Sequence, residues 1–550
     1  MSGTQTPKYT VHDQREVENF VLGVAESEAK PGMLLDSTSA ATAALTIMGS
    51  ESGQKPRAID ELLGLTALPE EKIVKAIFDG VNAFEREHGF KPTGDLILSA
   101  IDQGRSIYDS ATNNHHDQIS LTPNAPIVAI LGALAEACPF AGYLPADRGS
   151  NEARLIIVSH QAGSNWGGYK QGDLMDGIAQ GQPFLGSART QELAAPNDGA
   201  PLANYKFLFK EQSSGGNPIM LLRGRTIIYV NGMIAAQEIQ NGSLTQASVS
   251  VAGGITIDGT DYSLSGTIKP GTGEVVVTPT PALPDGTVVS AEAFADYEAD
   301  PTKTPKMMVQ AQVFQLFASP FRVTYQVTPE ARSQFSNEVG VDAGAEAMLA
   351  VRGQYAMERH YNALAKAKMI GKFNNHWTYD FDYDRQMEQK TRAQVWQDFA
   401  GVVGMASQKM AEDTADHGIT HMYVGKFVAA QYRTLDATLF QSSGIADRPG
   451  IFRVGRLFGL YEVYYSPWVV NEAPDGSVSE ILCVGRSTQT ARCPIIMGDA
   501  SAPMFEPLGT TETLKTGYGF NSRSFNAVNP HQMSALGCAV ITVKNMTAKS

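Results

Sequence analysis

The sequence predicts an α+β protein made of several folded units, and three observations support this prediction. Helical periodicity fills most of residues 1 to about 120 and returns in a long stretch at 342–371. Between these regions, closely spaced turn dipeptides separate short β-branched runs at 225–300. The chain has 550 residues, 43% of them apolar, which is enough for roughly two to four units with buried cores.

The composition excludes several classes of protein. A formal charge of −14 is poorly suited to holding nucleic acid by its phosphates, because that binding needs a concentrated Lys/Arg surface. The N-terminal MSGTQTPKYTVHDQ is polar and does not resemble a signal peptide. The longest apolar runs are too short to cross a membrane, so we expect no membrane span.

The four cysteines show no spacing typical of a zinc site or a redox motif. They lie far apart in mostly apolar surroundings, so we predict buried free thiols in a reducing compartment. These residues are Cys138, Cys483, Cys493 and Cys538.

Residues 1 to about 120 are predicted to form a helical and somewhat separate region. The clearest helix is PEEKIVKAIFDGVNAFEREH, in which Pro69 stands in the first turn and Ile73, Ile77 and Val81 share one face. Gly89 supplies the stop. The polar ATNNHH at 111–116 indicates a loop or linker.

The next region changes from irregular chain to a β-module. ARLIIVSHQ at 153–161 predicts a strand, and 162–217 is rich in glycine, glutamine and asparagine with weak periodicity. Such a stretch suits an arm, a lid or a long two-stranded excursion. At 225–300 we predict an inserted sandwich or barrel, with turns at Asn231-Gly232, Gly253-Gly254, Asp258-Gly259, Pro270-Gly271 and Pro284-Asp285-Gly286.

Two helices and several strands follow. FRVTYQV at 321–327 alternates as a strand, and Thr328-Pro329-Glu330 opens a helix. The long helix is predicted from an N-cap at Asp342 to a stop at Gly371. The further expected elements are a helix at 391–416 ended by Gly418, a strand at 421–424, a helix at 426–435, and strands at 479–485, 523–528 and 538–545.

A kinked hairpin is predicted at 450–468, GIFRVGRLFGLYEVYYSPW. The segment is too rich in β-formers for a helix, and Gly450, Gly455 and Gly459 break it too often for one plain strand. We expect Gly455 and Gly459 to occupy special backbone conformations in the hairpin.

A search for catalytic, cofactor and metal residues finds none that we would assign. Gly-x-Ser-x-Gly and His-Glu-x-x-His are absent, and neither Gly-Lys pair has the upstream glycine of a phosphate loop. Three clusters contain residue types that bind metal ions, but for each we expect a structural explanation. His115-His116-Asp117 suits a solvated loop, Asp416/His417/His421 suits a helix end, and DFDYD at 380–384, which could hold a hard cation, suits a solvated turn.

The order of these elements resembles the major capsid proteins of tailed bacteriophages. The segment from Val327 to Gly371 is similar to the start of the spine helix in the large myovirus-type branch, and PDGTVVSAEAFADYE looks like the exit of its inserted β-domain. RVGRLFGLYEVYYSP resembles the hairpin of the axial domain, and RCPIIMGDASAPMF at 492–505 resembles the return to the peripheral domain. The resemblance covers about residues 120–550.

The resemblance implies a tailed-phage major capsid fold with six parts. They are an N-terminal helical arm or domain at 1–120, the first part of the core with an extended loop at 121–225, an inserted β-domain at 226–300, a peripheral domain with the spine helix at 301–390, an axial domain at 391–500, and return strands at 501–550.

The resemblance also implies a structural, non-enzymatic function. The chain would form pentamers and hexamers of an icosahedral virion shell around packaged double-stranded DNA, assembled in the bacterial cytoplasm, with scaffold, portal and decoration proteins as further partners. No cofactor, membrane or sequence-specific DNA contact is expected. A tail-tube or decoration protein and a hydrolase with a dispersed site stay open as alternatives. Some relatives lose an N-terminal segment after Ile/Leu-x-Glu, a pattern matched at Ile59-Asp60-Glu61 and Leu134-Ala135-Glu136.

Overall fold

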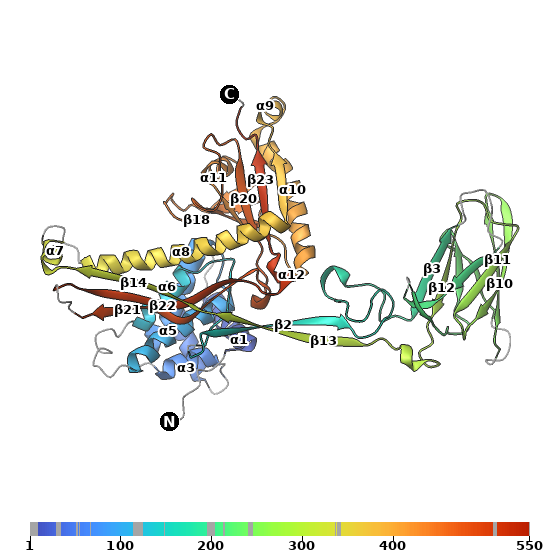
Figure 1. Cartoon of the computed structure of the whole chain (residues 1–550), viewed down its shortest axis with the longest axis horizontal. Coiled ribbons are helices and arrows are strands. Elements are labelled where there is room, and N and C mark those ends of the chain that lie inside the picture. The colour runs from blue at the N-terminus through green and yellow to red at the C-terminus, as the bar shows by residue number, and fades with distance from the viewer. Residues whose placement is uncertain are drawn as a thin grey trace. The chain divides into compact units, whose positions relative to one another are not determined.

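The computed structural model describes residues 9–28, 35–50, 53, 55–65, 68–113, 125–147, 149–194, 204–212, 215–239, 246–335, 337, 343–509 and 514–548. The chain divides into two compact units (Figure 1). Unit 1 comprises residues 1–157 and 313–550, and unit 2 comprises residues 158–312. Helices and strands are both abundant, so the α+β prediction is confirmed.

Among the described residues, six helices form the N-terminal part of unit 1. Helix α4 (Glu70–His88) follows Pro69, and Gly89 ends it in the left-handed conformation with φ 75°, as the sequence predicts. The other five are α1 (Val11–Glu28), α2 (Ser37–Gly49), α3 (Arg57–Leu65), α5 (Gly94–Asn113) and α6 (Ala125–Ala135).

The prediction that this helical region is separate is wrong. Its buried side chains form one hydrophobic core with residues far along the chain, including Leu364, Tyr423 and Tyr464. A buried ion pair joins Asp95 to Arg486 at 2.9 Å, and Gln103 donates to Asp499 at 2.8 Å. Because the helices bury apolar faces that their neighbours cannot cover alone, the whole layer packs on the rest of unit 1.

A 32-residue helix, α8 (Ala343–Asn374), runs along a four-stranded sheet of order β1-β21-β22-β14 (Figure 1). Its strands are β1 (Gly142–Tyr143), β21 (Ile495–Leu508), β22 (Thr516–Val528) and β14 (Ser319–Val327). Short helix α7 (Pro329–Gln334) starts at the predicted N-cap Thr328. The stop at Gly371 is wrong: a Cβ there would lie 2.8 Å from the backbone of Ala539, so this glycine allows close packing inside the helix.

Unit 1 also contains a seven-stranded sheet of order β15-β23-β20-β16-β19-β18-β17. Helices α10 (Arg392–Thr414) and α11 (Lys426–Tyr432) belong to this part, and α10 begins with a capping box between Thr391 and Gln394. The strands are β15 (His376–Asp380), β16 (His421–Val424), β17 (Phe440–Ser442), β18 (Phe452–Leu457), β19 (Tyr461–Tyr465), β20 (Ser479–Val484) and β23 (Cys538–Lys544). Helices α9 (Tyr383–Gln386) and α12 (Gln532–Ala535) are short.

Two boundaries predicted for this part are wrong. Strands β15 and β23 pair with each other and, through β20, with the rest of the seven-stranded sheet, so it extends beyond the predicted limits at 391 and 501. Pairing of strands more than 150 residues apart leaves no local mark in the sequence. Helix α10 ends at Ala415 in the left-handed conformation, three residues before the predicted Gly418.

Unit 2 is built on an eight-stranded antiparallel sheet of order β3-β12-β7-β8-β9-β10-β11-β4. The strands are β3 (Ala188–Ala194), β4 (Tyr205–Leu208), β7 (Ile227–Val230), β8 (Met233–Glu238), β9 (Val249–Ile257), β10 (Thr260–Lys269), β11 (Glu274–Thr280) and β12 (Val288–Phe294). Strands β5 (Lys210–Gln212) and β6 (Gly215–Pro218) pair separately. Strands β2 (Glu152–Ala162) and β13 (Met307–Phe317) form the two-stranded link between the units.

The β-module therefore starts earlier than position 226, because β3 pairs with β12 and β4 pairs with β11. Much of the region expected to be an extended loop thus belongs to the module. Asn231-Gly232 and Asp258-Gly259 are tight turns with positive φ, as predicted. The turn at Gly253-Gly254 is wrong: both glycines lie inside β9, where a Cβ on Gly253 would lie 2.1 Å from the carbonyl oxygen of Ala235.

Candidate functional site

The glycine-rich hairpin predicted at 450–468 is present in the seven-stranded sheet of unit 1. Strands β18 and β19 pair antiparallel, with a β-bulge between Arg453 and Gly455. The turn between them uses Phe458 and Gly459, both with positive φ (53° and 69°). Leu460 follows the turn and is 71% exposed. The hairpin therefore ends in an exposed leucine that another molecule can contact.

Gly455 is fixed by close packing. A Cβ at this position would lie 2.2 Å from the carbonyl oxygen of Gln441 and 2.6 Å from the ring of Phe440, both on edge strand β17. Gly459 has open space around its Cβ position, so its positive φ is the reason for glycine there. The prediction of a special backbone conformation is confirmed for Gly459 and is wrong for Gly455, where close packing against β17 is the reason for glycine.

The hairpin is held rigid by a buried carboxylate. Glu462 on β19 is 5% exposed and accepts from Nε of Arg453 and from Nε of Arg456, each at 2.6 Å. Both arginines come from β18, so the ion pairs bridge the two strands. A charged group at this depth is tolerated because two guanidinium groups compensate it.

Unit 1 exposes large apolar side chains at several places on its surface. They include Leu349 and Phe373 on α8, Met405 on α10, Leu460 after the hairpin turn and Trp468 after β19. Single exposed apolar residues are ordinary, but exposed Trp and Phe next to rigid elements are typical of surfaces that contact another protein.

The clusters weighed as possible metal sites do not converge. His417 contacts Asp416 at 3.1 Å, whereas His421 is buried and shares its Nδ1 with Thr420. The DFDYD segment runs from the last residue of β15 into the start of α9, and Asp380 accepts a hydrogen bond from Asn545. His115, His116 and Asp117 lie outside the described residues. Within the described ranges, no group of three or more His, Cys, Asp or Glu side chains could hold a metal ion.

The structure brings together three histidines that the sequence does not connect. His88 of α4 contacts the hydroxyl of Tyr464 at 3.1 Å, and His360 of α8 contacts the hydroxyl of Tyr423 at 3.0 Å. Burial lowers the pKa of His88 to about 3, of His360 to about 4 and of His421 to about 3. All three rings are therefore neutral near pH 7. No sequence spacing could have revealed a cluster drawn from three distant elements.

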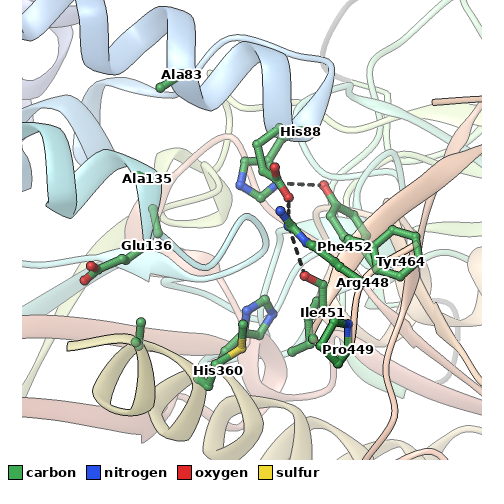
Figure 2. Close-up of a pocket in the computed structure, with 16 residues that line it drawn as sticks. Ala83, His88, Ala135, Glu136, His360, Arg448, Pro449, Ile451, Phe452 and Tyr464 are labelled. Atoms are coloured by element: carbon green, nitrogen blue, oxygen red, sulfur yellow. Dashed lines mark hydrogen bonds and ion pairs between the residues drawn. The ribbon is translucent and has the colours of Figure 1, made fainter. Parts of the chain in front are cut away.

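A pocket of about 610 Å³ opens beside this cluster (Figure 2). Its walls come from α4, the end of α6, α8 and residues 448–452. Arg448 is paired with Glu87, and Glu136 is paired with Arg352 at 2.6 Å. The lining contains no Ser, Thr, Cys, Lys or Asp side chain, and each of its two carboxylates, Glu87 and Glu136, is paired with an arginine.

The four cysteines are buried and unpaired, as predicted. Burial raises the pKa of Cys138 and of Cys493 to about 12 and raises the pKa of Cys483 and of Cys538 further. Among the helices of the described chain, none is long and apolar enough to cross a membrane.

Solved structures, but no family models and no curated proteins, are similar to this chain. No family model and no curated protein matches the sequence. The chain is similar to the capsid of jumbo bacteriophage PhiKZ at 10% identity and TM-score 0.37, over 74% of this chain and 91% of that chain. The capsid of Myoviridae phage XM1 matches at 7% identity and TM-score 0.29, over 64% and 90%.

A third match is to the holo-SrpI encapsulin complex from Synechococcus elongatus, at 12% identity and TM-score 0.26. It covers 44% of this chain and 80% of that chain. All three superpositions are loose.

Proposed function

We propose that this chain is the repeating subunit of an icosahedral virion shell, a major capsid protein that encloses packaged double-stranded DNA. The observation that carries the proposal is the order of elements in unit 1. Strand β14, helix α7 and the 32-residue α8 lead into the seven-stranded sheet with its glycine hairpin, and β21 then returns to the four-stranded sheet. The same order of a strand, a long helix, a glycine-kinked hairpin and a return strand underlies the sequence resemblance to tailed-phage capsid proteins, and this agreement in order supports the proposal.

The physical features of unit 1 suit a self-assembling protein. Helix α8, at about 1.5 Å per residue, is a rod of roughly 48 Å that can transmit load between the two sheets it contacts. The hairpin tip is rigid and presents Leu460, and Trp468 is 69% exposed nearby in sequence. Head-to-tail contacts of such surfaces close into rings when the rotation between copies is a fraction of a turn.

Shell stability then follows from repetition. An interface of ~1,600 Å² ranges from micromolar to picomolar affinity, and several such contacts per subunit make a closed shell collectively stable. The net charge of −14 suits a wall that does not trap packaged DNA, because carboxylates and phosphates repel each other. We further propose pentamers and hexamers as the rings, with scaffold and portal proteins as partners during assembly.

The alternatives receive less support from the structure. A tail-tube or decoration protein does not require the α8 rod or the N-terminal helices that pack on it. A hydrolase needs converging catalytic groups, and the pocket beside the histidines offers only neutral imidazoles and paired charges.

Negative-stain electron microscopy with light scattering tests the proposal. The protein is examined after expression alone and after co-expression with the products of its neighbouring genes. Particles are treated with nuclease before their DNA is extracted. Closed shells, rings of five or six, or polyheads support the proposal, and nuclease-protected DNA inside closed shells supports the virion role. A monodisperse monomer under all conditions contradicts it, whereas narrow tubes point to a tail protein.

A further inference from the structure

The pocket beside the histidines has the size and lining of a small-molecule site. Its volume of about 610 Å³ lies within the ~300–1,000 Å³ range of ligand pockets. Most of its walls are apolar, with Ala83 from α4, Ala135 from the end of α6, Ala356 and Met357 from α8, and Ile451 and Phe452 from the segment that leads into β18. No part of unit 2 contributes to the lining, so the pocket belongs to one compact unit.

Two polar groups converge on this apolar space. Figure 2 shows the rings of His88 and His360 entering the pocket from different helices. Each ring uses one nitrogen for a tyrosine hydroxyl: Nδ1 of His88 for Tyr464, and Nε2 of His360 for Tyr423. Within the described chain, the second nitrogen of neither ring has a hydrogen-bond partner, which leaves it available to a molecule in the pocket.

The tyrosine hydroxyls determine whether the second nitrogen of each histidine is a hydrogen-bond donor or an acceptor. A phenol is a better hydrogen-bond donor than an imidazole N–H, and an imidazole nitrogen is a better acceptor than a phenol oxygen, so each tyrosine donates to its histidine. Burial raises the pKa of Tyr423 and of Tyr464 well above the ordinary range, which keeps both hydroxyls protonated. Both imidazoles are neutral, so the proton of each lies on the second nitrogen. The pocket therefore presents two neutral N–H donors.

Charge at the pocket is already compensated. Arg448 pairs with Glu87 and also donates to the backbone of Ile451. Glu136 pairs with Arg352, and Figure 2 shows its carboxylate directed away from the two imidazoles. A charged guest would lose its water without gaining a counter-charge, which is costly in apolar surroundings.

We propose that this pocket binds a small, uncharged, mostly apolar molecule that carries a hydrogen-bond acceptor, such as the carbonyl group of a ketone, ester or amide. The guest contacts α4, α8 and residues 448–452 together. It therefore stabilises the packing of the N-terminal helices on the rest of unit 1, because it binds the folded arrangement only.

Saturation-transfer NMR on the full-length protein tests this proposal with 4-phenylbutan-2-one as the probe. The method suits large particles, and a molecule of this size is expected to bind with a Kd on the order of 1 mM. We expect transfer to its aromatic protons in the wild type and loss of the transfer in Ala356→Leu, which fills the pocket. Ala430→Leu is the matched control, because it makes the same change in a neighbouring pocket lined by Lys426 and Arg433. It should keep the signal.

Two further comparisons make the outcome decisive. Butylbenzene has nearly the same shape without the carbonyl, and His360→Phe removes one donor while keeping a ring. Losing one hydrogen bond should weaken ketone binding about three- to tenfold and leave butylbenzene binding unchanged. If Ala356→Leu does not fold, Ala83→Leu fills the pocket from α4 instead. Absence of transfer in the wild type, or equal transfer in the filled variants, overturns the proposal.

Discussion

Valine in place of Gly455 should detach the edge strand of the seven-stranded sheet. A Cβ there would lie 2.2 Å from the carbonyl oxygen of Gln441, which is 1.2 Å short of the 3.4 Å at which ordinary contact begins. Because the carbonyl oxygen of Gln441 is part of the backbone, no side-chain rotation relieves this contact, so β17 must move away. That movement breaks its pairing with β18 and exposes Phe440, which is 3% exposed in the native structure.

The cost can be worked from these two losses. Exposing a buried phenylalanine costs about 1.5–3 kcal/mol, and each lost backbone hydrogen bond adds roughly 1 kcal/mol, so we expect at least ~3 kcal/mol of local destabilisation. Gly459→Val meets no atoms, and its cost is backbone strain alone, about 1–2 kcal/mol. Gly271→Val is the matched control, because its Cβ position is open, and it should stay within ~0.5 kcal/mol.

Hydrogen exchange followed by mass spectrometry is the suitable assay. Because the chain has two compact units, one global unfolding free energy is not well defined, whereas exchange reports the local opening of β17 and β18. Shell yield by electron microscopy is the second readout, with the order wild type, Gly271→Val, Gly459→Val, Gly455→Val from best to worst. Native-like protection of β17 in Gly455→Val would refute the reasoning.

Other consequences of the structure can be measured on the same protein. Arg486→Met leaves the Asp95 carboxylate buried without its arginine partner and should lower the free energy of unfolding of unit 1, measured with denaturant, by about 3–5 kcal/mol. The additional Asp95→Asn change should restore part of that free energy. A loss below ~1 kcal/mol contradicts the prediction. Burial lowers the pKa of His88 to about 3, below its value in the unfolded chain, so the unfolded state binds the proton more readily. The free energy of unfolding should therefore fall as the pH drops from about 6.5 towards about 4. The expected fall is at most about 1.4 kcal/mol per pH unit for each such histidine. His88→Gln should flatten that slope in unfolding curves recorded between pH 7 and 4, and an unchanged slope would exclude His88 as a source. A Glu-specific protease should cut after Glu298, in an exposed turn, well before Glu61, which lies in α3 and binds Arg105 at 2.8 Å; early cleavage after Glu61 in mass spectra would show that α3 opens easily.

The ends of helices and the tight turns were predictable from the sequence, because they depend on residues that are neighbours along the chain. Pro69 and Gly89 bound α4, Thr328 opens α7, and Asn231-Gly232 makes a tight turn, all as the sequence indicates. The kinked hairpin was predictable for the same reason, since three glycines among aromatic and β-branched residues permit few other structures.

Where glycine serves tertiary packing, the same residue type gave the wrong prediction. Gly371 and Gly253 were expected to end a helix and to make a turn, yet both lie inside regular elements against another backbone. A glycine next to a distant chain segment and a glycine in a turn look alike in the sequence, because only the folded structure brings the second backbone near.

Taken alone, the sequence determined the α+β class, the long helix, the kinked hairpin and the strands at 225–300, and it contains no recognisable catalytic motif. Tertiary structure alone decided that β15 pairs with β23, that β3 and β4 complete the sheet of unit 2, and that the N-terminal helices share a core with α8. The tertiary structure also brought together the elements that line the pocket, including the two histidines whose imidazole rings enter it. The physical reason is that helix caps and turns depend on interactions over a few residues, whereas sheet partners, shared cores and pockets depend on which apolar surfaces meet when the whole chain is compact.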